Sequence, residues 1–233
     1  SSDLEVLELA DKIDAPIGSS MMGLTSAEYG HPRFLGMTGM HGKFVASKAL
    51  ASADLLIAVG TRFSDRATGN KTAFIKGKKV IHIDIDPSEI SKNIPAMVPL
   101  IGDVKQVLKK LNSELTKAER PDWAAIIDEL KQNPDSHLEM PKDTLNPQTV
   151  ISALNRYAER DTVVCTDVGQ HQMWTAQYYR FYEPRTFVTS GGLGTMGFGL
   201  GAALGACLGR DRKKTILVTS DGSFHMNMNR SEE

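Results

Sequence analysis

The chain has few cysteines, almost no net charge and no long hydrophobic run. Its only cysteines, Cys165 and Cys207, lie in apolar runs where a reduced thiol packs as a small hydrophobic group, so no disulfide framework is predicted. No run approaches the roughly 18 apolar residues that suggest a membrane-spanning helix. The 27 basic and 28 acidic residues nearly cancel, which gives no electrostatic basis for binding nucleic acid. We therefore expect small molecules or other subunits as partners, with no nucleic acid and no membrane.

The absence of a charged and then apolar leader, together with reduced cysteines, favours a cytoplasmic protein. Because the chain begins without methionine, an organelle-targeted parent whose leader has been removed stays an alternative.

Apolar runs of strand length alternate with segments of helical period, which predicts an α/β fold with parallel sheets. The expected strands cover residues 54–59, 79–84, 97–101, 162–165, 186–189 and 215–219. The expected helices cover residues 4–13, 104–115, 122–132 and 202–208, with Asp103 and Asp122 as N-caps.

Residues 133–146 carry two prolines, mixed charge and no apolar period, which is typical of an interdomain linker. The sequence thus predicts one domain over residues 1–132 and another over residues 147–233, each a three-layer α/β/α unit. Pro147 follows Asn146 at a favourable first-turn position of a helix. Both units read as truncated, because the first offers three or four strands and the second stops after its third.

A glycine-rich segment over residues 190–201, SGGLGTMGFGLG, follows an expected strand and precedes an expected helix. Gly192, Gly194 and Gly197 form G-x-G-x-x-G, and Asp221 ends the next strand 24 residues after Gly197, where a ribose-binding acid of an NAD site would stand. Glycines at such a place allow backbone N–H groups to approach a diphosphate of any kind, or simply allow close helix packing. The motif therefore indicates a phosphate site more firmly than an NAD site.

Asp221, Gly222 and Ser223 are expected to form a tight turn directly after the last strand. A carboxylate at such a turn can bind Mg²⁺, which prefers oxygen ligands and commonly bridges a protein carboxylate to a substrate phosphate.

Three segments of the second unit resemble, in order and spacing, the cofactor domain of thiamine-diphosphate enzymes. They are TDVGQHQMWTAQ, TSGGLGTMGFGLGAALGA and DGSFHMN, and the acetolactate synthases (acetohydroxyacid synthases) are the most similar members. The first unit resembles the FAD-binding middle domain of their catalytic subunit through FLGMTGMHG, ADLLIAVGTRFSDRATG and VIHIDIDPSEISKN.

The resemblance implies sites for thiamine diphosphate and Mg²⁺ in the second unit. Asp221 matches the first metal ligand, and Met196 matches the apolar residue that supports the bent form of the cofactor. The residues implied to contact thiamine diphosphate are Gly169, Gln170, His171, Gly194, Met196, Gly222 and Ser223. The reactive chemistry would belong to the cofactor, while the protein would supply shape and electrostatics.

The resemblance also implies an FAD site in the first unit. The residues implied to contact FAD are His41, Gly42, Gly60, Arg62, Asp84, Asp86, Asp103 and Val104. A carboxylate such as Asp84 can accept hydrogen bonds from a ribose, and Arg62 can pair with a phosphate as a planar fork. Asp103 fits a helix cap equally well, and Asp86 fits a turn. His82 is expected to be a core residue and His137 a solvated one.

The chain departs from the family pattern at Ser220, where the family has glycine, at Gly201, where it has proline, and at Ser64, where it has an acid. The asparagine that provides the second metal ligand and the glutamate that activates the cofactor are not in this sequence. The resemblance therefore implies a fragment with no certain catalytic residue, which would bind thiamine diphosphate weakly and not turn over pyruvate.

The activity implied for the parent is decarboxylation of pyruvate and its condensation with a second 2-keto acid, the first common step of branched-chain amino-acid synthesis. The parent is expected to be a homo-oligomer of catalytic subunits with a possible regulatory subunit. The alternatives are another thiamine-diphosphate carboligase or decarboxylase, a catalytically silent assembly module and, least favoured, an NAD-binding oxidoreductase.

Overall fold

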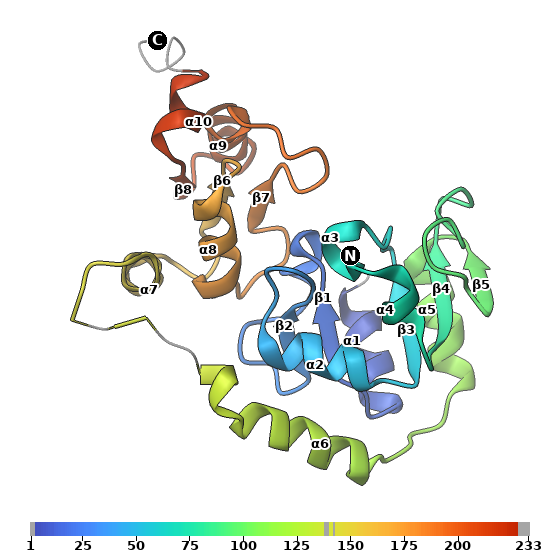
Figure 1. The fold of residues 1–233 in the computed structure, drawn as a ribbon. Coiled ribbons are helices and arrows are strands. Elements are labelled where there is room, and N and C mark those ends of the chain that lie inside the picture. Colours follow the sequence, from blue (N-terminus) through green and yellow to red (C-terminus); the bar gives the residue numbers. More distant parts are fainter. Residues whose placement is uncertain (1–2, 138–139, 142, 228–233) are drawn as a thin grey trace. The chain divides into compact units, whose positions relative to one another are not determined.

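The structure is a computed structural model that describes residues 3–137, 140–141 and 143–227 (Figure 1). The chain divides into two compact units. The first comprises residues 3–20 and 32–137, and the second comprises residues 21–31 with the described residues from 140 onward. The predicted domain limits of 1–132 and 147–233 stay a prediction, and residues 21–31 are grouped with the second unit.

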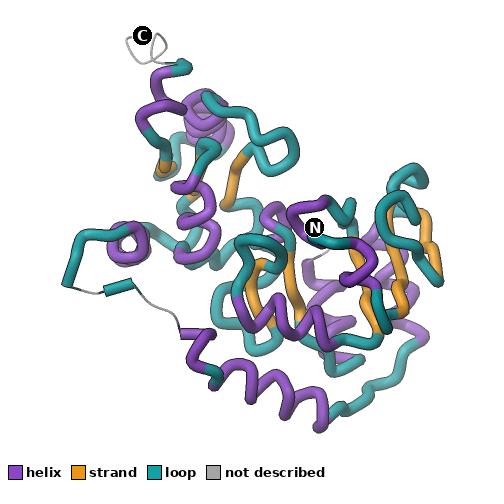
Figure 2. The backbone as a smooth tube through the Cα atoms, viewed as in Figure 1, coloured by secondary structure: helices purple, strands orange, loops and turns teal. Residues whose placement is uncertain are grey.

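The first unit contains two parallel sheets, with orders β1-β2 and β3-β4-β5. Figure 2 distinguishes the helices (purple), the strands (orange) and the loops (teal) of the chain. Its elements are α1 (Asp3–Lys12), β1 (Ile17–Ser19), β2 (Phe34–Met37), α2 (Phe44–Ser52), β3 (Leu55–Val59), α3 (Asp65–Thr68), α4 (Lys71–Ile75), β4 (Lys79–Asp84), β5 (Val98–Ile101), α5 (Val104–Glu114), α6 (Pro121–Gln132) and the 3-10 helix η2 (Pro134–His137).

Both faces of the β3-β4-β5 sheet are covered by other segments, and alternate residues of β4 point to opposite faces. Ile83 packs with Leu9 of α1 and Leu108 of α5, and all three side chains are buried. Val80 packs in a second buried cluster with Phe63 and Ile94. A third cluster joins β2, α2 and α6. The three-layer arrangement predicted for this unit is therefore present.

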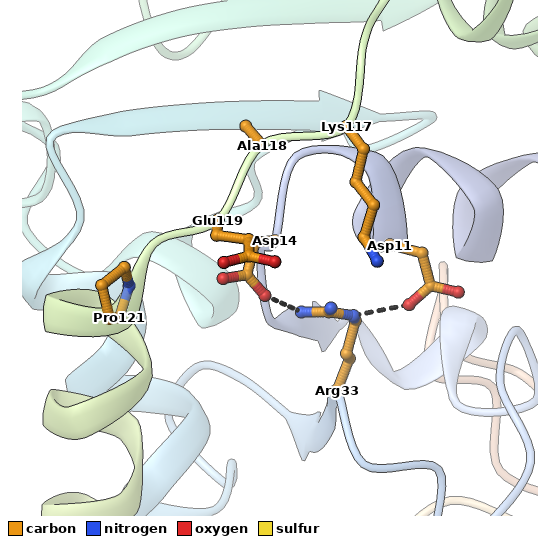
Figure 3. Close-up of a pocket in the computed structure, with 7 residues that line it drawn as sticks. All are labelled: Asp11, Asp14, Arg33, Lys117, Ala118, Glu119 and Pro121. Carbon is orange, nitrogen blue, oxygen red and sulfur yellow. Dashed lines mark hydrogen bonds and ion pairs between the residues drawn. The ribbon is translucent and has the colours of Figure 1, made fainter.

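A charged pocket of about 290 Å³ lies in the first unit, at the end of α1 (Figure 3). Arg33 is at its centre, with Nε 2.6 Å from Asp11 Oδ1 and Nη1 2.7 Å from Asp14 Oδ1. Asp14 also accepts a hydrogen bond from the backbone N–H of Arg120, and this bond, together with Arg33, lowers the pKa of the Asp14 carboxyl. Asp11 and Asp14 are thus each paired with Arg33. None of the predicted cofactor residues lines this pocket.

The second unit has a parallel sheet of order β7-β6-β8. Its elements are the 3-10 helix η1 (Met21–Gly23), α7 (Pro147–Tyr157), β6 (Val163–Thr166), α8 (Gln170–Tyr178), β7 (Phe187–Thr189), α9 (Phe198–Gly209), β8 (Thr215–Val218) and α10 (Asp221–His225). Every residue of the central strand β6 is buried, including Cys165, and burial raises the pKa of its thiol to about 11. The predicted role of Cys165 as core packing is confirmed, and Cys207 is half-buried in α9.

Residues 21–31 are held to the rest of the second unit by polar and aromatic contacts. The backbone N–H of Tyr29 donates to the carbonyl oxygen of Phe181 at 2.7 Å, and Arg160 forms an ion pair with Glu28 at 2.6 Å. The Tyr29 and Tyr182 rings lie 5.9 Å apart in an edge-to-face arrangement. These contacts explain why the segment groups with the second unit.

The α/β fold and the six predicted strands are confirmed, with limits shifted by one residue at most. The strands β1 and β2 were not predicted, because IGS and FLGM are too short to show a period of two. Asn146 caps α7 with a capping box formed by Thr149, as its position before Pro147 indicates.

Among the described residues, no helix is long and apolar enough to cross a membrane.

Three local predictions are wrong. Asp122 lies inside the first turn of α6, because Pro121 opens the helix and Arg120 occupies the N-cap. The helix α9 begins at Phe198 instead of Ala202, so Gly199 and Gly201 are helical. Asp221–Ser223 begin the short helix α10 instead of a tight turn, since the Phe224 N–H donates to the Ser220 carbonyl oxygen. His137 lies in η2, and its side chain is outside the described part.

Candidate functional site

The carboxyl ends of β6, β7 and β8 lie at one edge of their parallel sheet, where ligands of open α/β sheets bind. We call this the second-unit edge, formed by residues 167–171, 190–197 and 220–223. The Ser223 hydroxyl donates to the Val168 carbonyl oxygen at 3.2 Å. A Cβ placed on Gly194 would lie 3.9 Å from Val168, and one placed on Gly222 would lie 3.7 Å from the methyl group of Met196. The edge thus brings together Ser223, Gly222, Gly194 and Met196, while Gly169, Gln170 and His171 follow Val168 directly in the chain.

The glycine-rich segment at this edge has a conformation that requires glycine. Gly194 and Gly197 have φ values of 67° and 85°, in the left-handed region that other residues rarely adopt. Met196 stands between them with 41% of its surface exposed. An apolar side chain is thereby presented at the surface of the second-unit edge.

Asp167 fixes this segment, although its role was not predicted from the sequence. Its side chain is buried and accepts hydrogen bonds from the backbone N–H groups of Gly197 at 2.8 Å and Gly199 at 3.0 Å. These donors belong to the N-terminal end of α9, which an NAD site would need free for the diphosphate. Because Asp167 occupies them, the geometry disfavours the dinucleotide interpretation of G-x-G-x-x-G.

His171 lies in the first turn of α8, behind the exposed residues Gly169 and Gln170. Its side chain is 92% buried, since 8% of its surface is exposed, and its Nε2 has no hydrogen-bond partner among the described residues. Burial lowers the pKa of His171 below its ordinary value of 6.5, and this effect exceeds the opposing influence of the Asp167 charge. The lowered pKa favours the neutral imidazole at pH 7, with Nε2 a buried polar atom that has no partner among the described residues.

The lowered pKa of His171 predicts a loss of stability in acid. The unfolded chain binds a proton near pH 6.5 while the folded chain does not, so the stabilising difference is fully present above this pH and is lost as the pH falls towards the folded pKa. We expect the free energy of unfolding of the second unit to decrease below about pH 6.5. Urea unfolding between pH 7.5 and 5 should show this decrease in the wild type and a smaller one in His171→Gln. Equal slopes would contradict the prediction.

Asp221 is exposed at the first position of α10, and Ser223 is buried with its hydroxyl directed at Val168. In the described part of the chain, no group of three or more His, Cys, Asp or Glu side chains could hold a metal. Asp221 could therefore contribute one carboxylate to a Mg²⁺ ion whose other ligands are phosphate oxygens or water. An exposed carboxylate, a glycine segment with exposed backbone and the unpartnered Nε2 of His171 together fit a metal-bound diphosphate cofactor.

The predicted FAD residues of the first unit lie after strands β2 to β5. Asp84 is buried at the end of β4 and accepts a hydrogen bond from the Asp86 N–H at 2.9 Å. The Gly60 N–H donates to the Ile83 carbonyl oxygen, and the space around the Cβ position of Gly60 is open. Arg62 is exposed in the same segment. Open space beside a buried carboxylate and an exposed guanidinium is an arrangement that fits a ribose and phosphate ligand.

The remaining predicted FAD residues also have structural roles. Asp103 accepts a hydrogen bond from the Gln106 N–H at 3.0 Å, which caps α5, and Val104 packs in the core. Asp86 accepts from the Ser88 N–H at 2.8 Å, and its hydrogen bonds with Ser88 lower the pKa of its carboxyl. These contacts match the helix cap and the turn that the sequence offered as alternatives.

His41 and Gly42 lie in the loop between β2 and α2. Gly42 is required there, because an added Cβ would lie 2.5 Å from the Met37 carbonyl oxygen. The Met40 N–H donates to the Arg66 carbonyl oxygen at 2.9 Å, so this loop lies beside the segment that follows β3. His41 is exposed.

His82 confirms the prediction of a core residue. It is fully buried in β4, and its Nε2 lies 3.0 Å from the Thr61 carbonyl oxygen, to which it donates. The Nδ1 atom has no partner among the described residues. The ring contacts Phe63 edge-on at 5.1 Å and lies 4.0 Å from the Asp84 carboxylate. His82 thus connects the segments that follow β3 and β4.

Two family models of known proteins match separate parts of this chain. A family model described as thiamine pyrophosphate enzyme, central domain, matches residues 2–111. A second model, thiamine pyrophosphate enzyme, C-terminal TPP binding domain, matches residues 167–232. The second match contains the whole second-unit edge.

Several curated relatives are similar to this chain over almost its entire length. The acetolactate synthase large subunit of Buchnera aphidicola subsp. Acyrthosiphon pisum is 41% identical, covering 98% of this chain and 41% of the relative. The Haemophilus influenzae large subunit and the Escherichia coli isozyme 3 large subunit are each 40% identical, covering 96% of this chain and 40% of the relative. The chain therefore spans about two fifths of the length of these relatives. From the two family models and the geometry of the second-unit edge, we conclude that the chain belongs to the thiamine pyrophosphate enzymes.

Proposed function

We propose that this chain forms part of an acetolactate synthase catalytic subunit, in which its second unit binds thiamine diphosphate with Mg²⁺ and its first unit binds FAD. The observation that supports the proposal is the second-unit edge, where the segments carrying Asp221, the glycines and His171 meet through the contacts of Ser223 and Gly194 with Val168 and of Gly222 with Met196. The large-subunit names of the relatives support the choice of activity within the family.

In this proposal the residues of the second-unit edge bind and orient the cofactor. Asp221 holds Mg²⁺ against the diphosphate, the backbone around Gly194 and Gly222 allows close approach, and Met196 packs against the cofactor. The neutral His171 is proposed to contact the cofactor beside these residues. When bound, thiamine diphosphate supplies the chemistry that decarboxylates a 2-keto acid such as pyruvate and joins its remainder to a second 2-keto acid.

In the first unit, Asp84 and Arg62 are proposed to bind the ribose and phosphate groups of FAD. His41 and Gly42 border the same site from the loop before α2. A homo-oligomer of catalytic subunits, a regulatory subunit and a cytoplasmic location remain predictions for the parent protein.

Titration of the purified chain with separate ligands tests this function. Isothermal titration should detect thiamine diphosphate in the presence of Mg²⁺, a much weaker signal when EDTA removes the metal, and FAD binding independent of Mg²⁺. NAD should give no saturable heat. Saturable NAD binding without thiamine diphosphate binding would overturn the proposal and restore the dinucleotide interpretation.

Asp221→Asn should weaken Mg²⁺-dependent binding of thiamine diphosphate at least ~10-fold, because the variant removes the exposed carboxylate of the second-unit edge, whereas the Asp167 carboxylate is buried. Its stability should hardly change, since Asp221 is exposed. Asp211→Asn is the matched control, because Asp211 is an exposed acid that precedes β8, at the opposite end of the strand. Equal affinities of the two variants would remove Asp221 from the metal site.

A further inference from the structure

We propose that Asp167 is a positioning residue, which holds the glycine-rich segment 194–199 in the conformation that receives thiamine diphosphate. This inference rests on the proposed function, because it concerns the same cofactor. Asp167 would act through the backbone N–H groups of Gly197 and Gly199, without itself contacting the cofactor.

Asp167 can fix the glycine-rich segment because both its backbone and its carboxylate are held by hydrogen bonds. Its backbone N–H donates to the Val218 carbonyl oxygen at 3.0 Å, which ties it to β8. Its Oδ1 accepts from the N–H groups of Gly197 and Val168, and its Oδ2 accepts from the N–H of Gly199. Only 2% of the residue is exposed, so water does not compete for these bonds. A displacement of the carboxylate would therefore move the backbone of the segment.

Close packing adds to these hydrogen bonds. A Cβ on Gly199 would lie 2.9 Å from Asp167 Oδ2 and 3.0 Å from the Asp167 backbone nitrogen. A residue larger than glycine at position 199 would therefore collide with Asp167. Met196 directly precedes Gly197, which bonds to Asp167, and its methyl group lies against Gly222 of α10. The position of Met196 at the second-unit edge consequently depends on where Asp167 holds Gly197.

His171 is a second target of Asp167. The Asp167 carboxylate charge and its backbone hydrogen bond both raise the pKa of His171, against the larger lowering effect of burial. One buried acid thus bonds to the glycine-rich segment and also influences His171 within its own segment. This arrangement exceeds what the capping of one helix would need.

Charge alone predicts the opposite effect on the cofactor. A buried carboxylate near a diphosphate repels it, so neutralising Asp167 would tighten binding if electrostatics dominated. The positioning role predicts weaker binding, because the segment loses its fixed conformation and must be ordered when the ligand binds. The sign of the change therefore separates the two explanations.

The test uses Asp167→Asn in the full chain, with Val164→Ala as a control for stability. Val164 is fully buried in β6, and its truncation removes core packing while leaving the hydrogen bonds of the Asp167 carboxylate in place. We expect Asp167→Asn to weaken Mg²⁺-dependent binding of thiamine diphosphate ~10-fold or more and to accelerate amide exchange of Gly197 and Gly199 ~100-fold relative to β6. Val164→Ala should keep wild-type affinity, with any loss of protection shared by the whole unit.

The imidazole of His171 gives a further readout that does not need the cofactor. Because the Asp167 charge raises the pKa of His171, Asp167→Asn should lower it further, which NMR can follow among the six histidines of the chain. The control Val164→Ala should leave the His171 titration unchanged.

The proposal is overturned if Asp167→Asn binds thiamine diphosphate as tightly as wild type or more tightly. It is also overturned if Gly197 and Gly199 exchange at unprotected rates in the folded wild-type chain, a measurement that remains decisive if the variant does not fold. Absence of thiamine diphosphate binding by the wild type contradicts the proposed function, while amide exchange still decides whether Asp167 holds the segment.

Discussion

Replacing Gly199 with alanine is expected to lower the free energy of unfolding of the second unit by about 3 kcal/mol. The added methyl group would lie 2.8 Å from Leu217 Cδ1 and 2.9 Å from Asp167 Oδ2, where the neighbours are packed on both sides. The helix must shift, which strains the core and weakens the hydrogen bond between the Gly199 N–H and Asp167. A buried carboxylate that loses a donor adds its own cost to that of the collision.

Gly201→Ala is the matched control, because Gly201 belongs to the same helix and its Cβ would meet nothing within 4 Å. Alanine at an open position in a helix should raise the free energy of unfolding by about 0.5–1 kcal/mol, since glycine loses more conformational entropy on folding. Urea unfolding can follow the second unit through Trp174 in a Trp123→Phe background, because each unit contains one tryptophan. Similar stabilities for the two variants would contradict the packing described for Gly199.

Replacing His82 with leucine should lower the free energy of unfolding of the first unit by about 2–3 kcal/mol. Leucine fills much of the imidazole volume but cannot donate to the Thr61 carbonyl oxygen, which would then lack its bond from β4. An unsatisfied buried acceptor costs more than the net value of the hydrogen bond that it replaces. The segment carrying Gly60 and Arg62 should also loosen, so FAD affinity should decrease.

His82→Gln is the informative companion variant. The glutamine amide nitrogen can take the place of Nε2 and donate to Thr61, so this variant should keep roughly half of the stability lost in His82→Leu. Trp123 fluorescence in a Trp174→Phe background reports on the first unit. If both variants are equally unstable, packing against Phe63 determines the role of His82, and the hydrogen bond to Thr61 does not.

The sequence predicted most of the second-unit edge because its signals are local. The strands β6 and β8 are rich in β-branched residues, and Asn146 before Pro147 is a strong helix start in the same unit. Parallel strands place their carboxyl ends at one edge, so residues after β6, β7 and β8 could be expected to meet there. The roles of those residues, in contrast, came from a family resemblance.

Asp167 could not be singled out because its contacts are not local. Its partners Gly197 and Gly199 lie 30 and 32 residues away, and neither the turn nor the strand pattern around Thr166 marks a buried acid. The only available signal was an acid directly after a buried strand that faces a glycine-rich segment. Similarly, the start of α9 was predicted too late because glycine has low helix propensity, whereas the bonds from Gly197 and Gly199 to Asp167 stabilise the first turn.

Amide hydrogen exchange of the full chain, with and without thiamine diphosphate and Mg²⁺, tests the location of the cofactor site most directly. The proposed function predicts that the ligand slows exchange in residues 167–171, 194–197 and 221–223, and that removing Mg²⁺ abolishes the effect. The first unit should respond to FAD and not to thiamine diphosphate. Unchanged exchange in these three segments at ligand saturation, or protection confined to the first unit, would contradict the assignment of the second-unit edge.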